Sequence, residues 1–115
     1  MSRVFVVQNQ HRWDRDNEKF VPKFDLSPAG IHGELVYLLS PTAAPFRPAP
    51  VIEELRRKLE DFTSDDALLL VGNPVLIGLA VAVAADYNDG QVNLLQWSGK
   101  NRKYLKVEVS DLFTS

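Results

Sequence analysis

LLLVGNPVLIGLAVAVAADYNDG, from Leu68 to Gly90, passes from a continuous apolar run through Gly72-Asn73-Pro74 into an Ala-rich stretch. A continuous apolar run is typical of a strand that is covered on both faces. Gly72 suits the turn that follows, Asn73 suits a helix N-cap, and Pro74 suits the first helical position, where no N–H partner is needed. The stretch therefore predicts a strand, a tight turn and a helix that packs closely on a sheet.

Further segments extend this unit on both sides. Arg3 to Gln8 and Gly33 to Ser40 have the β-branched and apolar residues of strands, and Val51 to Phe62 has apolar residues at helical spacing. Gln91 to Ser98 and Lys103 to Val109 flank a turn and predict a β-hairpin. The expected order is β-β-α-β-α-β-β. This is an α/β fold in a single globular domain, residues 1–115, with a mixed sheet of about five strands and two helices.

The second strand of the predicted hairpin alternates in polarity along its length. We expect one face to be buried, with Leu105, Val107 and Val109, and the other to meet water, with Tyr104, Lys106 and Glu108. The hairpin would then form an antiparallel edge of the sheet, with one side in the core and one side wet.

Two segments lack the pattern of a helix or strand. Asn9 to Gly30 is polar and charged with scattered aromatics, and so long an irregular segment is uncommon unless function or an excursion such as a hairpin justifies it. Pro41 to Pro50 contains four prolines, which predicts an extended connector without helix or sheet ladder. Pro45 and Pro48 also have the spacing of a PxxP ligand.

The composition is that of an ordinary globular protein and excludes several classes of function. A formal net charge of -2 argues against broad electrostatic capture of nucleic acid or anionic lipid. The chain has no cysteine, which excludes thiolate nucleophiles and Cys-ligated zinc and suits a cytoplasmic protein. No apolar stretch reaches the roughly 20 residues of a membrane-spanning helix, so we expect no membrane partner.

Polar and aromatic residues concentrate directly after the first predicted strand. Loops on a rigid scaffold often carry binding residues, and Arg and Trp are the types that anchor protein interfaces. The alternative is a solvated loop whose tryptophan covers the edge of the core. The candidate residues for binding a protein partner are His11, Arg12, Trp13, Arg15 and Phe20.

A second candidate site is the predicted hairpin near its turn. Its aromatic and basic side chains are the mixture that stacks on bases and contacts phosphates, and the residues are Trp97, Lys100, Arg102, Lys103 and Tyr104. Nucleic acid is therefore an alternative partner. The other interpretation is a charged edge hairpin that resists edge-to-edge aggregation.

A third candidate function is a nucleotide- or phosphate-binding enzyme built on the Gly72-Asn73-Pro74 turn, with Gly72 and Asn73 as the anion site, because a helix N-terminus can hold a phosphate. The dinucleotide and P-loop fingerprints are absent, and Pro74 removes one N–H donor, so a structural turn explains the same residues. Asp14, Asp16 and Glu18 lack the glycine and terminal glutamate of a calcium loop. We expect no catalytic residues, no metal and no cofactor.

Part of the chain resembles a known group of proteins. The strand, Gly-Asn-Pro, the Ala-rich helix, Asn-Asp-Gly, then LLQW and a basic turn ending in Tyr104 are similar to small proteins of bacteriophages and integrative elements. The resemblance covers the last 45 or so residues. It implies an accessory protein of mobile DNA, and with the residues above it predicts a non-enzymatic protein-interaction module, monomeric or homodimeric.

Overall fold

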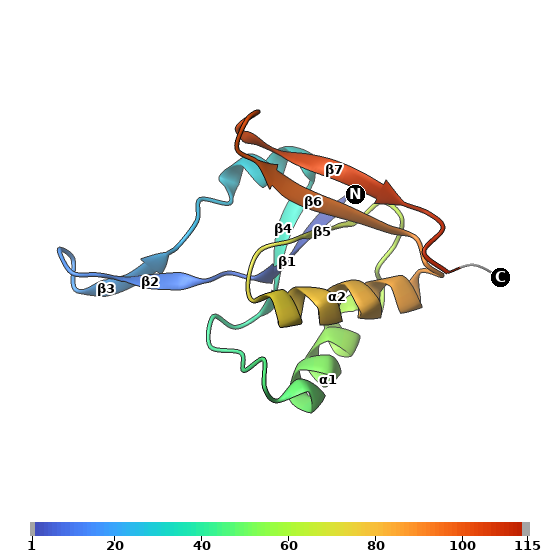
Figure 1. Cartoon of the computed structure of the whole chain (residues 1–115), viewed down its shortest axis with the longest axis horizontal. Coiled ribbons are helices and arrows are strands. Elements are labelled where there is room, and N and C mark those ends of the chain that lie inside the picture. The colour runs from blue at the N-terminus through green and yellow to red at the C-terminus, as the bar shows by residue number, and fades with distance from the viewer. Residues whose placement is uncertain (1, 114–115) are drawn as a thin grey trace.

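The computed structural model describes residues 2–113 and contains a five-stranded mixed sheet with the order β4-β1-β5-β6-β7 (Figure 1). Parallel pairing joins β4 to β1, β1 to β5 and β5 to β6, whereas β7 is antiparallel to β6. The mixed α/β sheet of five strands with two α-helices is confirmed. The bounds are β1 Arg3–Gln8, β4 Glu34–Leu39, β5 Ala67–Leu69, β6 Val92–Ser98 and β7 Lys103–Val109.

Both faces of the sheet are covered, but by different kinds of element. Helices α1 (Pro48–Leu59) and α2 (Pro74–Tyr87) lie on one face, over a core that includes Phe5 and Leu68. The 3₁₀ helix η1 (Ser27–His32) packs on the opposite face. Because the interior strand β1 is covered on both sides, its four consecutive apolar residues are all buried. Among the described residues, no helix has the length and apolar character needed to cross a membrane.

Helix α1 begins earlier than the sequence predicted. It starts at Pro48 rather than Val51 and ends at Leu59 rather than Phe62. The prediction that prolines exclude helix as far as Pro50 was wrong, because Pro48 and Pro50 lie in the first turn, where N–H groups have no intrahelical partner. Since Pro48 is helical, the proposed PxxP spacing with Pro45 does not form an extended ligand.

The burial of β7 differs in part from the prediction. Tyr104 is buried in the cluster on the η1 side, whereas Leu105 and Val107 are exposed. On the helix side, α2 packs against β1 and β6, and β7 lies beyond them at the edge of the sheet. Lys106 and Glu108 are exposed as predicted, and Val109 is partly buried against the helix-side core. The prediction was therefore wrong at Tyr104, Leu105 and Val107, where β7 extends beyond the cover of α2.

The segment 9–30 contains structure that the sequence pattern did not resolve. Strands β2 (His11–Asp14) and β3 (Lys19–Pro22) form a separate two-stranded antiparallel sheet. Figure 1 shows this hairpin extending from the end of β1 away from the rest of the molecule. We call residues 11–22 the arm. Of the two explanations for the long polar segment, the hairpin excursion is the one observed.

A buried ion pair fixes the start of β1. Asp66, just before β5, is 1% exposed, and its carboxylate accepts hydrogen bonds from Nη2 of Arg3 at 2.8 Å and Nε at 3.2 Å. The N–H and hydroxyl of Thr63 donate to the same carboxylate. Burial on its own would raise the pKa of Asp66, but the bonds from Arg3 and Thr63 outweigh it and hold that pKa below its ordinary value. Arg3 also pairs with the exposed Asp61.

We expect Asp66→Asn to lower the free energy of unfolding by about 3 kcal/mol, because a neutral amide cannot replace the charge-assisted bonds that the buried carboxylate accepts from Arg3 and Thr63. The matched control, Asp61→Asn, removes the exposed partner of the same arginine and should cost less than about 1 kcal/mol. Urea unfolding of the two variants measures the difference. Equal losses would contradict a special role for the buried carboxylate.

The same pair should make stability depend on acid. Since the pKa of Asp66 is lower in the folded protein than the roughly 3.9 of an unfolded chain, its contribution is complete above that value and is lost as the pH falls through the folded-state pKa. The gap in unfolding free energy between wild type and Asp66→Asn should be constant from about pH 5 to 7 and narrow below about pH 4. Unfolding curves over this range test it, and a gap that widens in acid would refute it.

Candidate functional site

The arm carries all five residues predicted to bind a partner, and these residues lie on its two faces and in its turn. Trp13 lies opposite Phe20 across the two strands, with ring centroids 5.1 Å apart and an edge-to-face arrangement. His11 shares their face, since side chains two apart on a strand point the same way. Arg12 lies on the other face, and Arg15 lies in the turn. One face of the arm is therefore aromatic and the other is charged.

The aromatic face is not part of the core. Trp13 is 50% exposed and Phe20 is 69% exposed, and neither belongs to the two buried hydrophobic clusters. The alternative in which Trp13 covers the edge of the core does not fit this placement. Instead, each ring has the other as its aromatic neighbour, and both are open to solvent.

The turn of the arm is held by its own side chains. The Asp14 carboxylate accepts hydrogen bonds from the amide of Asn17 at 2.8 Å and the backbone N–H of Asp16 at 3.1 Å. The bond from Asn17, with these backbone contacts, holds the pKa of Asp14 below its ordinary value. Glu18 has a positive φ of 50°, as the turn requires. Within residues 2–113, no three His, Asp or Glu side chains are grouped so that they could hold a metal ion.

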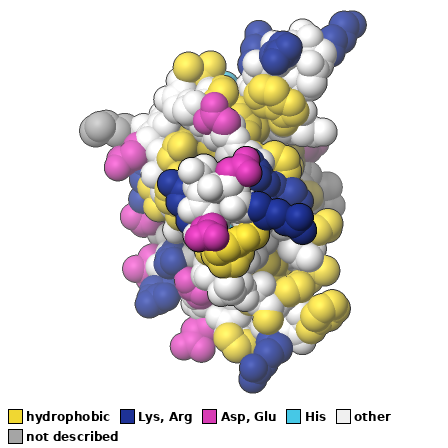
Figure 2. All heavy atoms as spheres, turned by 90° about the vertical axis from the view of Figure 1, so that its left-hand side faces the viewer, with side chains coloured by type: hydrophobic (Ala, Val, Ile, Leu, Met, Phe, Trp, Pro, Cys, Tyr) yellow, Lys and Arg dark blue, Asp and Glu magenta, His cyan; other side chains and the backbone are white. Residues whose placement is uncertain are grey.

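The charges on the arm are mixed. Figure 2 looks onto the side from which the arm projects and shows basic, acidic and hydrophobic side chains next to one another. A surface that binds nucleic acid is expected to carry one predominant sign of charge. The mixture is closer to that of a protein interface, in which aromatic anchors are surrounded by polar groups.

The base of the arm is fixed by Gln8, the last residue of β1. Its side chain is buried, and its amide donates to the carbonyl of Ser40 at 3.2 Å while its Oε1 accepts from the N–H of Asn73 at 3.0 Å. The backbone N–H of Gln8 donates to Val71. One side chain therefore joins the end of β1 to the end of β4 and the start of α2.

The turn at Gly72 and Asn73 caps helix α2, as the structural interpretation of these residues predicted. Oδ1 of Asn73 accepts the N–H of Val75 at 2.9 Å, which caps α2, and Pro74 is the first helical residue. The N–H of Asn73 is bonded to Gln8. Two of the donors that an anion would need already have acceptors within the chain. Anion binding at Gly72 and Asn73 stays a prediction.

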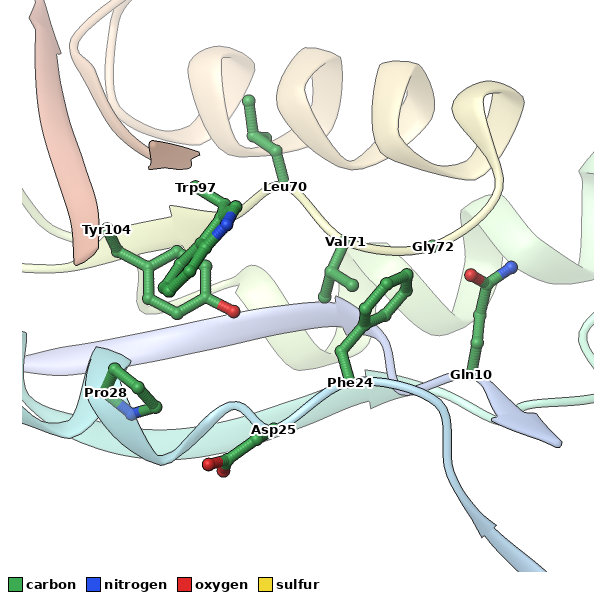
Figure 3. Close-up of a pocket in the computed structure, with 9 residues that line it drawn as sticks. All are labelled: Gln10, Phe24, Asp25, Pro28, Leu70, Val71, Gly72, Trp97 and Tyr104. Carbon is green, nitrogen blue, oxygen red and sulfur yellow. The ribbon is translucent and has the colours of Figure 1, made fainter. Parts of the chain in front are cut away.

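A pocket of about 540 Å³ lies next to the base of the arm (Figure 3). It opens beyond the carboxyl ends of β1, β5 and β6, where the connection after β1 leaves on the η1 side and the connection after β5 leaves on the helix side. Crevices at such switch points are the usual ligand sites of open α/β sheets. The lining comprises Gln10, Phe24, Asp25, Pro28, Leu70, Val71, Gly72, Trp97 and Tyr104.

Aromatic rings form the walls of the pocket. Trp97 and Tyr104 lie side by side with centroids 5.0 Å apart, and Figure 3 shows Phe24 facing them with Val71 between. Burial, and to a lesser extent the charge of Asp25, raises the pKa of Tyr104. The pocket is thus mainly apolar, with a single carboxylate in its lining.

The residues predicted to bind nucleic acid are divided between two places. Trp97 and Tyr104 line the pocket, whereas Lys100 and Arg102 lie in the turn that follows β6 and Lys103 begins β7. These three basic residues are exposed and do not line the pocket. Six other pocket residues come from separate segments of the chain and form no local motif, so the sequence did not indicate them: Gln10, Phe24, Asp25, Pro28, Leu70 and Val71.

The sequence matches a family of phage proteins. The model of the phage Pam3 gp32-like family matches residues 2–111. The chain belongs to this family. No curated protein and no solved structure matches the chain.

Membership of the phage Pam3 gp32-like family confirms the resemblance to phage proteins and corrects its extent. The resemblance was expected over the last 45 or so residues, but the match covers nearly the whole chain. It includes the arm and every residue that lines the pocket. The first half of the chain, which the resemblance had left out, is therefore part of what defines this phage protein.

We expect Gly72→Ala to destabilise this phage Pam3 gp32-like protein by more than about 1 kcal/mol, because Gly72 has a φ of 124° and an added Cβ would lie 2.6 Å from Cβ of Gln8. Gly78→Ala is the control. Gly78 is exposed in α2 with open space around it, so alanine should add up to about 1 kcal/mol of stability. Thermal unfolding of both variants measures the two signs, and a neutral Gly72→Ala would contradict the close approach.

Proposed function

We propose that this phage protein is a non-enzymatic interaction module that binds a protein partner through its arm. The observation that carries the proposal is the exposed aromatic pair of Trp13 and Phe20 on a hairpin that projects from the folded body. Neither ring is buried in the core. A surface that becomes buried in a complex would explain why the arm carries both rings.

The energetics of the arm support this role. An isolated two-stranded hairpin is marginally stable in water, and this one is paired with no other strand. Its backbone is nevertheless ordered by the Asp14 turn and by the bond from the N–H of Lys23 to the carbonyl of Gln10 at 2.7 Å. A preformed arm loses less conformational entropy when it binds than a flexible loop would.

The chemistry of the aromatic face indicates which kind of partner it fits. Trp is among the residue types that dominate binding energy at protein interfaces, and such anchors insert into apolar pockets on the partner. Charged residues on the other face, among them Arg12 and Lys19, would lie toward the polar rim. We therefore propose a phage or host protein with an apolar groove of about the width of two rings.

We expect the double variant Trp13→Ala/Phe20→Ala to bind its partner at least tenfold more weakly, which corresponds to about 1.4 kcal/mol, with an unchanged melting temperature. The partner is isolated on immobilised protein from lysate of phage-infected cells, with and without nuclease treatment, identified by mass spectrometry and then titrated in pure form. Val107→Ala removes an exposed apolar side chain outside the arm and should bind as the wild type does.

Two results would contradict the proposal. Undiminished affinity of the arm variant would remove the arm from the interface. Capture that disappears with nuclease, falls steeply with salt and is lost in Arg102→Ala/Lys103→Ala would favour the nucleic-acid alternative.

A further inference from the structure

The loop between β4 and α1 presents one phenylalanine to solvent. Phe46 is 93% exposed, more than any other large hydrophobic side chain in residues 2–113. Burying such a side chain contributes roughly 1.5–3 kcal/mol, and this one makes no such contribution within its own chain. The ring therefore has the character of an anchor for another molecule.

The loop that carries Phe46 is rigid. Pro45 precedes it and Pro48 begins α1, so two φ angles close to it are fixed by proline rings. The N–H of Arg47 donates to the carbonyl of Ala44 at 3.2 Å, which closes a turn with Phe46 inside it. Such an anchor is presented at low entropic cost, as tight association requires.

The aromatic pocket has the size and lining that a phenylalanine ring needs. Its volume lies within the range of pockets that bury small ligands, and Phe24, Trp97 and Tyr104 offer ring edges and faces. Val71 lines the pocket between Trp97 and Phe24, as Figure 3 shows. Aromatic side chains pack favourably in such edge-to-face surroundings.

The charges beside Phe46 and in the pocket lining favour the same contact. Arg47 follows Phe46 in the loop and is exposed. Asp25 is the one acidic residue in the lining of the pocket, and Figure 3 shows its carboxylate turned away from Val71 toward the outside. With a phenylalanine ring inside the pocket, the arginine that follows it would lie at the rim, where a carboxylate is the complementary group.

The two parts face different sides of one molecule. Ala43, in the loop before Phe46, packs against the helix-side core, whereas Pro28 and Tyr104 of the pocket belong to the η1 side. We propose that Phe46 and Arg47 of one copy dock into the aromatic pocket of a second copy, with Arg47 against Asp25. Each copy then has one anchor and one pocket, so the contact extends to a ring or a chain of copies.

Complementation between two variants tests this arrangement. Phe46→Asp keeps the pocket and loses the anchor, whereas Trp97→Ala keeps the anchor and loses a pocket wall. By sedimentation velocity we expect the wild type to associate with rising concentration, each variant alone to stay monomeric, and an equal mixture to form a one-to-one complex. Ile31→Asp, which changes another exposed apolar residue, should associate like the wild type.

A charge exchange tests the rim without changing the rings. Asp25→Lys and Arg47→Asp should each weaken association, and the double variant should restore it. Trp13→Ala/Phe20→Ala should leave association unchanged, which separates this contact from the arm and its partner.

A peptide supplies a second readout if a variant fails to fold. The blocked peptide PTAAPFRPAP, residues 41–50, is titrated into Trp13→Phe/Phe46→Asp protein, in which Trp97 is the remaining tryptophan. We expect a saturable change in Trp97 fluorescence that is absent with the peptide carrying alanine in place of Phe46. A wild type that is monomeric at every concentration together with no response to the peptide would overturn the proposal. Association that persists in Phe46→Asp, or a response to an oligonucleotide alone, would do the same.

Discussion

The buried amide of Gln8 holds the functional end of the molecule together. Gln8 ends the interior strand β1. Its side-chain amide donates to the carbonyl of Ser40 after β4 and accepts from the N–H of Asn73 at the start of α2. Gly72 has no side chain where Cβ of Gln8 approaches it. Because only two residues separate Gln8 from the arm and the pocket borders Gly72, the positions of both depend on this one residue.

The sequence predicted the parts of the fold that are buried. β1 and α2 were recognised because burial demands continuous apolar residues, and the final hairpin was recognised from its strands and turn. The predictions were wrong where the burial of a residue does not follow from its residue type. Leu105 is apolar but exposed, because nothing covers that side of β7, and Pro48 is helical because a first-turn residue needs no N–H.

The candidate site was predicted only in part, because exposed residues also leave little pattern in the sequence. The residue types around Trp13 indicated an interface, but the arm is exposed on both faces, so its strands have no hydrophobic period to reveal them. The pocket gave no local signal at all. Phe24 and Trp97 are separated by most of the chain. They meet because η1 packs on the sheet face to which Tyr104 of β7, the partner of Trp97, also contributes.

The separation between arm and body has a consequence for evolution. Residues 11–22 belong to neither hydrophobic cluster, whereas the body is constrained by close packing on both faces of its sheet. Changes in the arm are therefore filtered by what it touches outside the molecule and hardly at all by the requirement to fold. A phage can alter this surface one residue at a time while the scaffold beneath it stays the same.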